Sequence, residues 1–234
     1  MFTIQQQKDI KTIVHPNPKT KQKDGTLKRI HSWGNFMNIG FKIASAPWIL
    51  MISDDLLICK DVIRNGLDKL NKLIKKGEKI GGGAIYWRDY PRNIKYHIRL
   101  LPGNNIHINH GFFKKEALIE IGYCDEDNYE FYCADADLTM RLNLSGWKTI
   151  ELKDCFAEHL NHRINLNKLL YGKLNLSLIR DINSFENKYG SLVNGAIEID
   201  KPNSKDNTSL VFWKLDPIIC FQGWLLRKLN INYY

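Results

Sequence analysis

The sequence has few cysteines, and none of them form a close pair. Five cysteines are scattered through 234 residues without any C-x-x-C spacing. Their odd number and wide separation argue against a zinc knuckle and against a disulfide framework. We therefore expect free thiols, as in a reducing cytosol.

Long apolar runs are also missing. No run approaches the ~20 apolar residues that cross a bilayer, and the first residues contain no apolar segment typical of a secretory signal. The hydrophobic fraction of 44% and charged fraction of 25% are those of an ordinary globular protein, which argues against disorder. We expect a cytoplasmic protein that is soluble or peripheral to a membrane.

Acidic residues are outnumbered by basic ones, 25 against 34, for a net charge of +9. Much of the excess lies in residues 8–29 and 69–79. Such charge could face nucleic acid, an anionic membrane or a phosphorylated substrate. A solvated face is the commoner explanation of a charge run, so composition alone assigns no partner.

Apolar periodicity predicts strands that alternate with helices, which indicates an α/β layered fold. Helices are predicted at residues 35–45, 61–77, 114–121, 134–145 and 166–189. Strands are predicted at 10–14, 47–52, 80–86 and 147–152, with loops at 19–28, 87–108 and 123–133 and a polar linker at 194–207. The run at 47–52 shows no alternation, which favours a strand buried on both faces, as in a parallel sheet.

Two acidic pairs are candidates for chemistry. Asp54 and Asp55 follow the strand at 47–52, where ligands bind in open α/β sheets. Adjacent carboxylates there suit Mg²⁺ or Mn²⁺, although a polar turn also explains them. Asp135 and Asp137 open the helix at 134–145, where acids often serve only as caps. A carboxylate at that position in a cleft can instead act as a general base.

His159 ends the stretch that follows the strand at 147–152. A single histidine is more often a structural hydrogen-bonding group than a metal ligand. His162 follows three residues later, but no cysteine or acidic partner stands at zinc spacing. From the residues alone, both roles stay open for His159.

Taken together, three stretches resemble the inverting glycosyltransferase family 2, which has the GT-A fold. The match covers about residues 35–190. It is carried by Asn38-Ile39-Gly40 with residues 44–55, by residues 111–118 with 121–126, and by residues 134–138 with Arg141-Leu142 and Gly146-Trp147. These resemble the family's asparagine helix with its D-x-D metal motif, the segment closing the acceptor site, and the E-D-x-D-L…R-L…G-W block. Residues 184–190 are similar to a segment that often follows the domain.

The resemblance implies a role for each matching residue. Asp55 and His159 would bind Mn²⁺ or Mg²⁺, and Asp135 would be the catalytic base. The donor side would use Ser53, Asp54 and Asn38, and the acceptor and donor-sugar pocket would use Gly111, Asp137, Arg141 and Trp147. The implied reaction transfers a sugar from a nucleotide-sugar to a hydroxyl of a glycan or lipid-linked acceptor, as in polysaccharide biosynthesis, with inversion at the anomeric carbon.

The sequence departs from the family in three places. Ser53 replaces the first acid of the metal motif, and Ala134 replaces the acid before the base. Family members usually have about a hundred residues before the metal motif, whereas here 53 precede Asp54. We therefore expect an N-terminally shortened, GT-A-like (Rossmann-like) mixed sheet flanked by helices in residues 1–190, followed by a linker and an aromatic tail in residues 191–234.

Other functions fit parts of the sequence. A truncated or non-catalytic relative would keep the fold with little turnover. A sugar nucleotidyltransferase would need a glycine-rich phosphate loop near the N-terminus, and none is present. A basic nucleic-acid-binding module leaves both acidic pairs unexplained, so we expect no specific nucleic acid. The tail at 210–234 would either contact an anionic membrane or pack on the domain.

Overall fold

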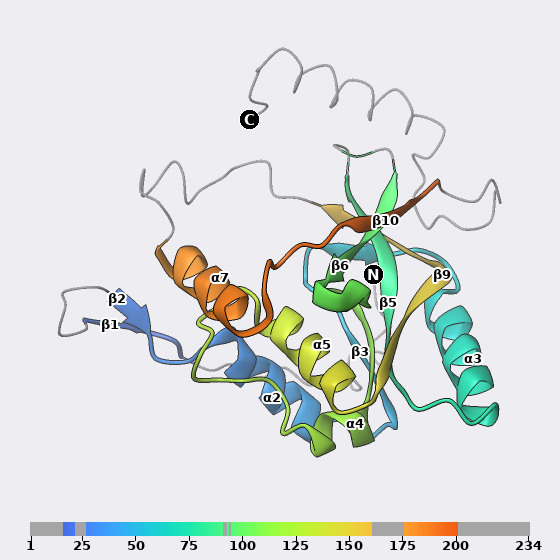
Figure 1. Ribbon diagram of the computed structural model, residues 1–234, viewed down its shortest axis with the longest axis horizontal. Helices are drawn as coiled ribbons and strands as arrows, with labels where there is room; N and C mark the ends of the chain where they lie inside the picture. Colours follow the sequence, from blue (N-terminus) through green and yellow to red (C-terminus); the bar gives the residue numbers. More distant parts are fainter. Residues whose placement is uncertain (1–15, 22–26, 91–92, 94, 161–175, 201–234) are drawn as a thin grey trace, which may run out of the picture.

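The computed structural model describes residues 16–21, 27–90, 93, 95–160 and 176–200 (Figure 1). Its helices are α2 (Trp33–Ile43), α3 (Val62–Lys75), α4 (Lys115–Glu120), α5 (Ala134–Leu144) and α7 (Leu176–Tyr189), with a 3₁₀ turn, η1 (Pro102–Asn104). Its strands are β1 (Lys19–Lys21), β2 (Leu27–Arg29), β3 (Trp48–Met51), β4 (Leu56–Ile58), β5 (Ile80–Tyr90), β6 (Tyr96–Leu101), β7 (Asn105–Ile106), β8 (Gly111–Lys114), β9 (Lys148–Leu160) and β10 (Ala196–Ile199).

A mixed sheet is built around the long strand β5 (Figure 1). One edge of β5 pairs in parallel with β9, and the other pairs antiparallel with β8 and then with β6. β4 extends the sheet beyond β9, β3 beyond β8, and β10 beyond β6. The fold is therefore α/β, with a mixed, curled sheet that is compatible with a Rossmann-like architecture.

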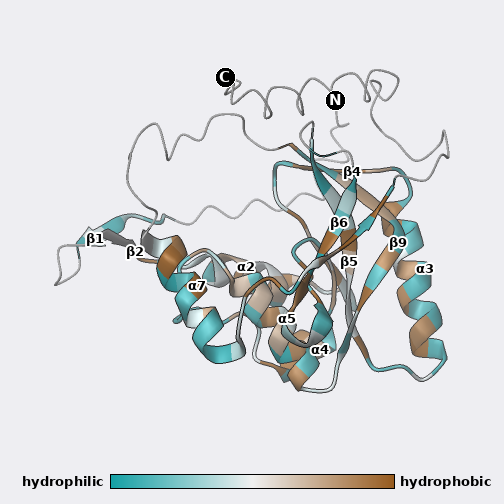
Figure 2. Ribbon diagram, turned by 45° about the horizontal axis from the view of Figure 1, so that its top comes forward, coloured by the Kyte–Doolittle hydropathy of each residue, from teal (hydrophilic) through white to brown (hydrophobic). Residues whose placement is uncertain are grey.

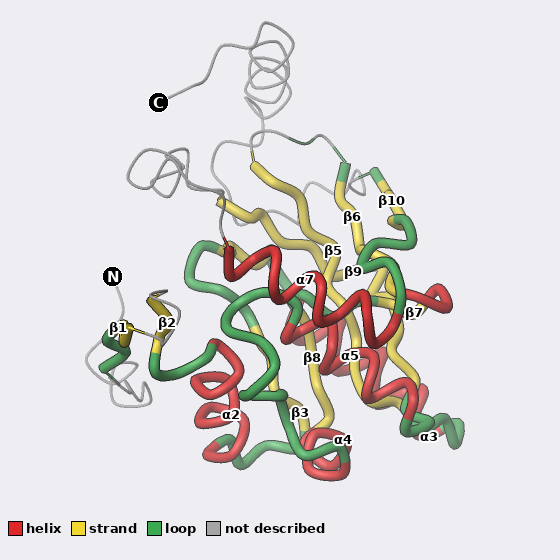
Figure 3. The backbone as a smooth tube through the Cα atoms, turned by 60° about the vertical axis from the view of Figure 1, so that its left-hand side comes forward, coloured by secondary structure: helices red, strands yellow, loops and turns green. Residues whose placement is uncertain are grey.

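Helices flank this sheet (Figures 1 and 3). α3 packs on β9 and β5, whereas α5, α2 and α7 lie together on the other side of the sheet. In α3 the apolar residues Val62 and Leu70 are buried, and Lys69 and Lys72 are exposed. Figure 2 shows hydrophilic and hydrophobic residues alternating along α3. The amphipathic helix predicted at 61–77 is thus confirmed.

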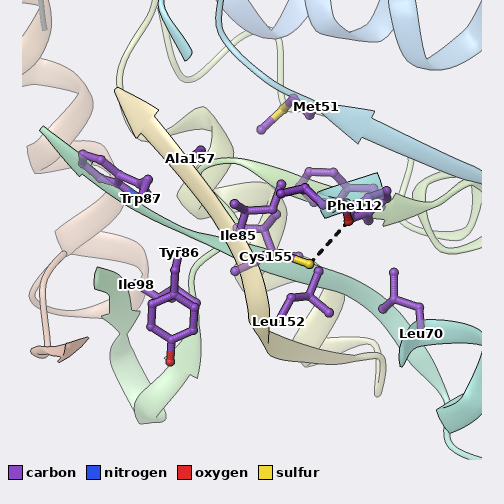
Figure 4. Packing of buried hydrophobic residues seen from close by; sticks show 14 of the residues in the cluster. Met51, Leu70, Ile85, Tyr86, Trp87, Ile98, Phe112, Leu152, Cys155 and Ala157 are labelled. Carbon is purple, nitrogen blue, oxygen red and sulfur yellow. Dashed lines mark hydrogen bonds between the residues drawn. The ribbon is translucent and has the colours of Figure 1, made fainter. Parts of the chain in front are cut away.

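The core lies between β5, β8, β9 and α3 (Figure 4). Ile85 and Leu152 are each 1% exposed, and the thiol of Cys155 donates to the carbonyl oxygen of Val62 at 3.4 Å. Burial raises the pKa of the Cys155 thiol to about 12, so it stays protonated and unreactive near neutral pH. The four described cysteines are all buried and free, as the sequence predicts.

Glycines let β5 and β8 approach closely. A Cβ on Gly82 would lie 2.5 Å from the carbonyl oxygen of Phe112, and one on Gly111 would lie 2.1 Å from that of Gly83. No side chain fits at such distances, which explains glycine at positions 82 and 111. Gly111, expected in a substrate pocket, therefore has a clear structural role at this strand contact.

Helix ends follow the sequence signals. Gly77, Gly122 and Gly146, predicted to end three helices, all have left-handed φ angles between 77° and 84°. Only glycine adopts this conformation without steric cost, and it ends a helix efficiently. Asp61 stands at the expected N-cap position of α3, but its side chain makes no capping hydrogen bond.

Four sequence predictions of local structure were wrong. Residues 87–108, expected to be irregular, contain the end of β5 together with β6 and β7. Residues 196–199, expected in a linker, form β10. The expected loop at 19–28 includes both strands of the β1–β2 hairpin. β3, expected to be buried in a parallel sheet, is antiparallel to β8 and only its Met51 is buried.

Two of these errors share a physical reason. β6 and β10 are short strands whose stability comes from pairing with each other, residue 196 opposite residue 99 and residue 199 opposite residue 96. Such pairing is absent from any local pattern. The alternation of Ile197, Glu198 and Ile199 was the one local signal for β10. The strand predicted at 10–14 and the tail at 210–234 lie outside the described residues.

Within the described residues, no helix combines the length and the apolar character needed to cross a bilayer.

Candidate functional site

The first part of the site lies where β3 and β9 end. The turn Ser53-Asp54-Asp55 follows β3, and the next residue, Leu56, pairs with His159 in the β4–β9 ladder. The N–H of Leu160 donates to the carbonyl oxygen of Asp55 at 2.8 Å. As a result, Asp55 Oδ2 lies 3.3 Å from His159 Nε2, which brings together the two residues expected to bind a metal.

Asp89, which the sequence analysis missed, holds the other side of this imidazole. Residue 89 of β5 pairs with residue 159 of β9, and Asp89 Oδ1 lies 2.8 Å from His159 Nδ1. The hydrogen bond to Asp89, with a further contribution from Asp55, raises the pKa of His159. An imidazole between two carboxylates needs a positive charge, which either a second proton or a bound cation supplies.

Asp55 and His159 fit a divalent cation as a pair. Two ligand atoms about 2.1 Å from a cation and at right angles lie about 3 Å apart, close to the separation found here. Within the described part of the chain, no group of three or more His, Cys, Asp or Glu side chains is arranged to hold a metal ion. A cation here would complete its shell with substrate oxygens and water, as Mg²⁺ commonly does.

The neighbours of Asp55 in the turn play different parts. Ser53 Oγ donates a 2.5 Å hydrogen bond to Asp55 Oδ1, so Ser53 orients the carboxylate. Asp54 is exposed to solvent and stands beside Asp55. Of the two acids, Asp55 is the one that faces His159.

The second part of the site is Asp135, at the start of α5. The preceding Cys133 has a left-handed φ of 62°, which turns the chain sharply into the helix. Asp135 Oδ2 accepts from Asn109 Nδ2 at 2.6 Å and lies 3.1 Å from His107 Nε2, while Oδ1 accepts from the N–H of Ala136 at 2.9 Å.

These contacts set the charge state of Asp135. Burial alone would raise the pKa of the carboxyl, but His107, Asn109 and the N–H of Ala136 together lower it to about 2. Asp135 is thus ionised at neutral pH, as a general base must be. Its side chain keeps 17% of its surface exposed, so a ligand can reach it.

The segment of residues 107–110 links the two parts of the site. It runs into β8, which lies between β3 and β5. The ring of His110 is 5.9 Å from that of His159, and the pKa of His110 responds to both Asp55 and Asp135. Burial, aided by the nearby His159, lowers that pKa to about 4, so His110 is neutral near pH 7. Residues 107–110 thus lie against both acidic groups, His110 beside His159 and Asn109 on Asp135.

Trp87 forms an aromatic base under this site. Its ring centroid lies 5.4 Å from that of His159, 5.8 Å from His110 and 4.2 Å from His97. The guanidinium of Arg99 lies over the same ring at 5.5 Å. These side chains restrict the orientation of both histidines.

Neither a protein-family model nor a curated protein matches this chain.

Asp137 and Arg141, expected in the substrate pocket, form a buried structural network. Asp137 is fully buried and accepts from Arg141 Nε at 2.6 Å and from Lys188 Nζ and Tyr189 OH, each at 2.8 Å. Arg141 also donates to the carbonyl oxygen of Ile121 at 2.8 Å. This network joins α7 to α5, and it joins α5 to Ile121, which directly follows α4.

Asn38 is likewise committed to the fold. Its amide nitrogen donates to the carbonyl oxygen of Cys124 and to Glu126, and its oxygen accepts from the N–H of Cys124. Asn38 thus ties α2 to the acidic loop at 123–133. Both of its donor hydrogens are used in this way, although the sequence predicted a donor-binding role.

The structure does not bring Trp147 to the site. Trp147 packs on Gly81 at the first end of β5, whereas Asp89 and His159 stand at the other end. Along β5, residues 81 and 89 are eight positions apart, which at about 3.3 Å per strand residue puts the two ends roughly 26 Å from each other. The residue belongs to the core rather than to this site.

Four residues of the site were missed: Asp89, His107, Asn109 and His110. For His107, Asn109 and His110 the only local signal is the cluster of polar side chains just before the apolar residues 112 and 113. For Asp89, no local signal indicates a contact with a residue 70 positions away.

Proposed function

We propose that this protein is a metal-dependent, inverting glycosyltransferase with a GT-A-like fold, which transfers a sugar from a nucleotide-sugar donor to an acceptor hydroxyl. One observation carries the proposal. The segment of residues 107–110 borders both groups: the ring of His110 lies 5.9 Å from that of His159, the partner of Asp55, and Asn109 donates to Asp135 at 2.6 Å. The resemblance of residues 35–190 to glycosyltransferase family 2 assigns Asp55 and Asp135 to metal and base.

Asp55 and His159 would hold Mn²⁺ or Mg²⁺. When bound, the cation would offset the negative charge that grows on the leaving diphosphate. Asp89 would keep Nε2 of His159 directed at Asp55 by accepting a hydrogen bond from Nδ1–H, the arrangement that orients metal-binding imidazoles in many proteins. Ser53 fixes Asp55 from the other side.

Asp135 would act as the general base. Its carboxylate accepts the proton of the acceptor hydroxyl as that oxygen attacks the anomeric carbon from the face opposite the leaving group. One bond forms between the acceptor oxygen and the anomeric carbon, and the bond from that carbon to the diphosphate oxygen breaks with its electron pair. Attack from the opposite face inverts the configuration, and no covalent enzyme intermediate is required.

The test is transfer or hydrolysis by the full chain with a panel of nucleotide sugars and Mn²⁺. We compare the wild type with Asp55→Ala, Asp135→Asn and a control, Asp68→Asn, an exposed acid on α3. Loss of the base should reduce turnover by about 10²–10⁴-fold. Loss of Asp55 should also weaken the dependence on Mn²⁺, and the control should match the wild type.

Two outcomes would count against the proposal. If the wild type turns over and Asp135→Asn keeps full transfer activity, Asp135 is not the base. If the wild type neither turns over nor binds any donor by calorimetry with Mn²⁺, the chain is a non-catalytic relative.

A further inference from the structure

His107 is an unusual buried residue beside the candidate base. Its side chain is only 6% exposed, and neither ring nitrogen makes a well-aligned hydrogen bond to a described residue. Nε2 lies 3.1 Å from Asp135 Oδ2, but the N–H does not point along that line. Leaving a buried polar group unpaired is costly, so a retained one calls for an explanation.

The chain around His107 holds the ring in place. The N–H of His107 donates to the carbonyl oxygen of Arg99 on β6 at 3.1 Å. The N–H of Ile108 donates to Thr139 Oγ1 at 3.3 Å, and that hydroxyl donates to the carbonyl oxygen of Asp135 at 2.9 Å. These bonds fix the backbone of His107 relative to α5, and Nε2 is already within 3.1 Å of the carboxylate.

The carboxylate itself has room for one more partner. An ionised carboxyl offers about four lone-pair positions. Asn109 and His107 approach Oδ2, and Ala136 donates to Oδ1. The remaining position is on Oδ1, and it is available to a substrate hydroxyl.

We infer that His107 is a positioning residue for Asp135: its imidazole aligns on Oδ2 when substrate binds, holds the carboxylate with Oδ1 toward the acceptor, and keeps it ionised. The inference rests on the proposed function, because it assigns His107 to the base of that reaction. Catalytic hydrogen bonds are often poorly aligned without substrate and tighten in the complex. A merely structural histidine would be expected to satisfy its ring nitrogens, whereas this one is presented to the carboxylate.

Other groups near Asp135 do not take this role. His110, Cys124 and Cys133 interact with it electrostatically. Burial, together with His159, lowers the pKa of His110 to about 4, and burial raises the pKa of both thiols to about 12. All three are therefore neutral near pH 7, and Asn109 is neutral at any pH. Among the described residues, His107 is the imidazole in contact with Asp135, with Nε2 3.1 Å from Oδ2.

The first measurement needs no activity. The pKa of Asp135 is followed through its carboxyl ¹³C resonance, assigned with Asp135→Asn, in the wild type, His107→Phe, His107→Gln and a control, His31→Phe. We expect His107→Phe to raise this pKa by at least about one unit. Burial raises the pKa of Asp135, and the variant lacks one of the groups that lower it. His107→Gln keeps an N–H donor and should shift it less, and the control should not shift it. An unchanged pKa in His107→Phe overturns the inference.

The second measurement uses turnover. In His107→Phe the acidic limb of the kcat/KM profile should move to higher pH by the same shift, with kcat reduced and the KM for the donor unchanged. His107→Gln should recover part of kcat. An acidic limb that stays in place while kcat falls would mean a structural role and overturn the inference. If the wild type turns over no nucleotide sugar, the proposed function fails, while the ¹³C titration still decides whether His107 controls the charge of Asp135.

Discussion

The buried ion pair between Arg88 and Glu158 offers a sharp test of how the site is held. Arg88 Nε lies 2.7 Å from Glu158 Oε2 and its Nη2 lies 3.0 Å from Oε1, with the side chains only 4% and 1% exposed. The hydroxyl of Tyr96 also donates to Glu158. Residue 88 pairs with residue 158, and the next pair along the same two strands is Asp89 with His159. A slip of one residue would turn His159 to the other face of the sheet.

Replacing one partner alone leaves an uncompensated charge in the core. We expect Arg88→Met or Glu158→Leu each to lower the free energy of unfolding by about 3–5 kcal/mol. For a chain of this size that corresponds to roughly 6–20 °C in Tm. Removing both charges and the orphaned hydroxyl, by adding Tyr96→Phe, should recover most of the loss, because well-packed apolar residues often replace a buried ion pair at little cost.

Urea unfolding followed by tryptophan fluorescence measures these differences. The matched control is Glu120→Gln, which breaks an exposed ion pair. Lys79 and Glu120 are 3.3 Å apart, and their side chains are 48% and 45% exposed. That change should cost less than about 1 kcal/mol. If the single core variants lose no more than this control, or if the combined variant loses the sum of the single losses, the reasoning about the buried pair is wrong.

Three further predictions follow from packing and charge. Gly66→Ala should destabilise the protein by about 1–3 kcal/mol, because the new Cβ would lie 2.5 Å from Phe112 Cε2. Gly40→Ala is the matched control: its Cβ meets nothing within 4 Å, and the change should stabilise the protein by about 0.5–1 kcal/mol. Equal effects of the two changes in thermal unfolding would contradict the packing argument. Asp181→Ala should cost about 2–4 kcal/mol and speed amide hydrogen exchange at residues 130–132, whose N–H groups donate to that carboxylate; unchanged exchange would exclude this role. The pKa of Asp135 lies below the ordinary 3.8, at about 2, so its charge contributes about 2 kcal/mol above about pH 4 and loses it as the pH falls toward 2. The stability difference between the wild type and Asp135→Asn should therefore shrink by roughly half at pH 3, and a difference independent of pH would contradict the assignment.

Local sequence signals predicted the helices well. Each helix has apolar spacing over three or more positions, and Gly77, Gly122 and Gly146 mark their ends. These signals are local, because a helix forms its hydrogen bonds within a few residues. The same locality made Asp55 and Asp135 visible, since one acid follows an apolar strand and the other opens a helix.

Strand partners and the site's contacts depend on tertiary structure. β6 and β10 stay in the sheet through pairing with segments far away in the sequence, and β9 extends to Leu160 because β5 supports it. The length of β9 separates Trp147 from the site. Trp147 stands just before the first residue of this strand, and His159 is close to its last residue. Short strands carry too few residues for periodicity to reveal them.

Local patterns in the sequence specify the helices and their glycine ends, and they mark Asp55 and Asp135 as candidate site residues. The tertiary structure adds that Asp89 contacts His159, that Asn109 and His107 lie against Asp135, and that Asp137 joins α7 to α5 through Lys188 and Tyr189. The reason is the register of strands and the packing of helices, which join residues tens of positions apart. A site built from such contacts is specified by the whole sequence, but it cannot be read from any one stretch of it.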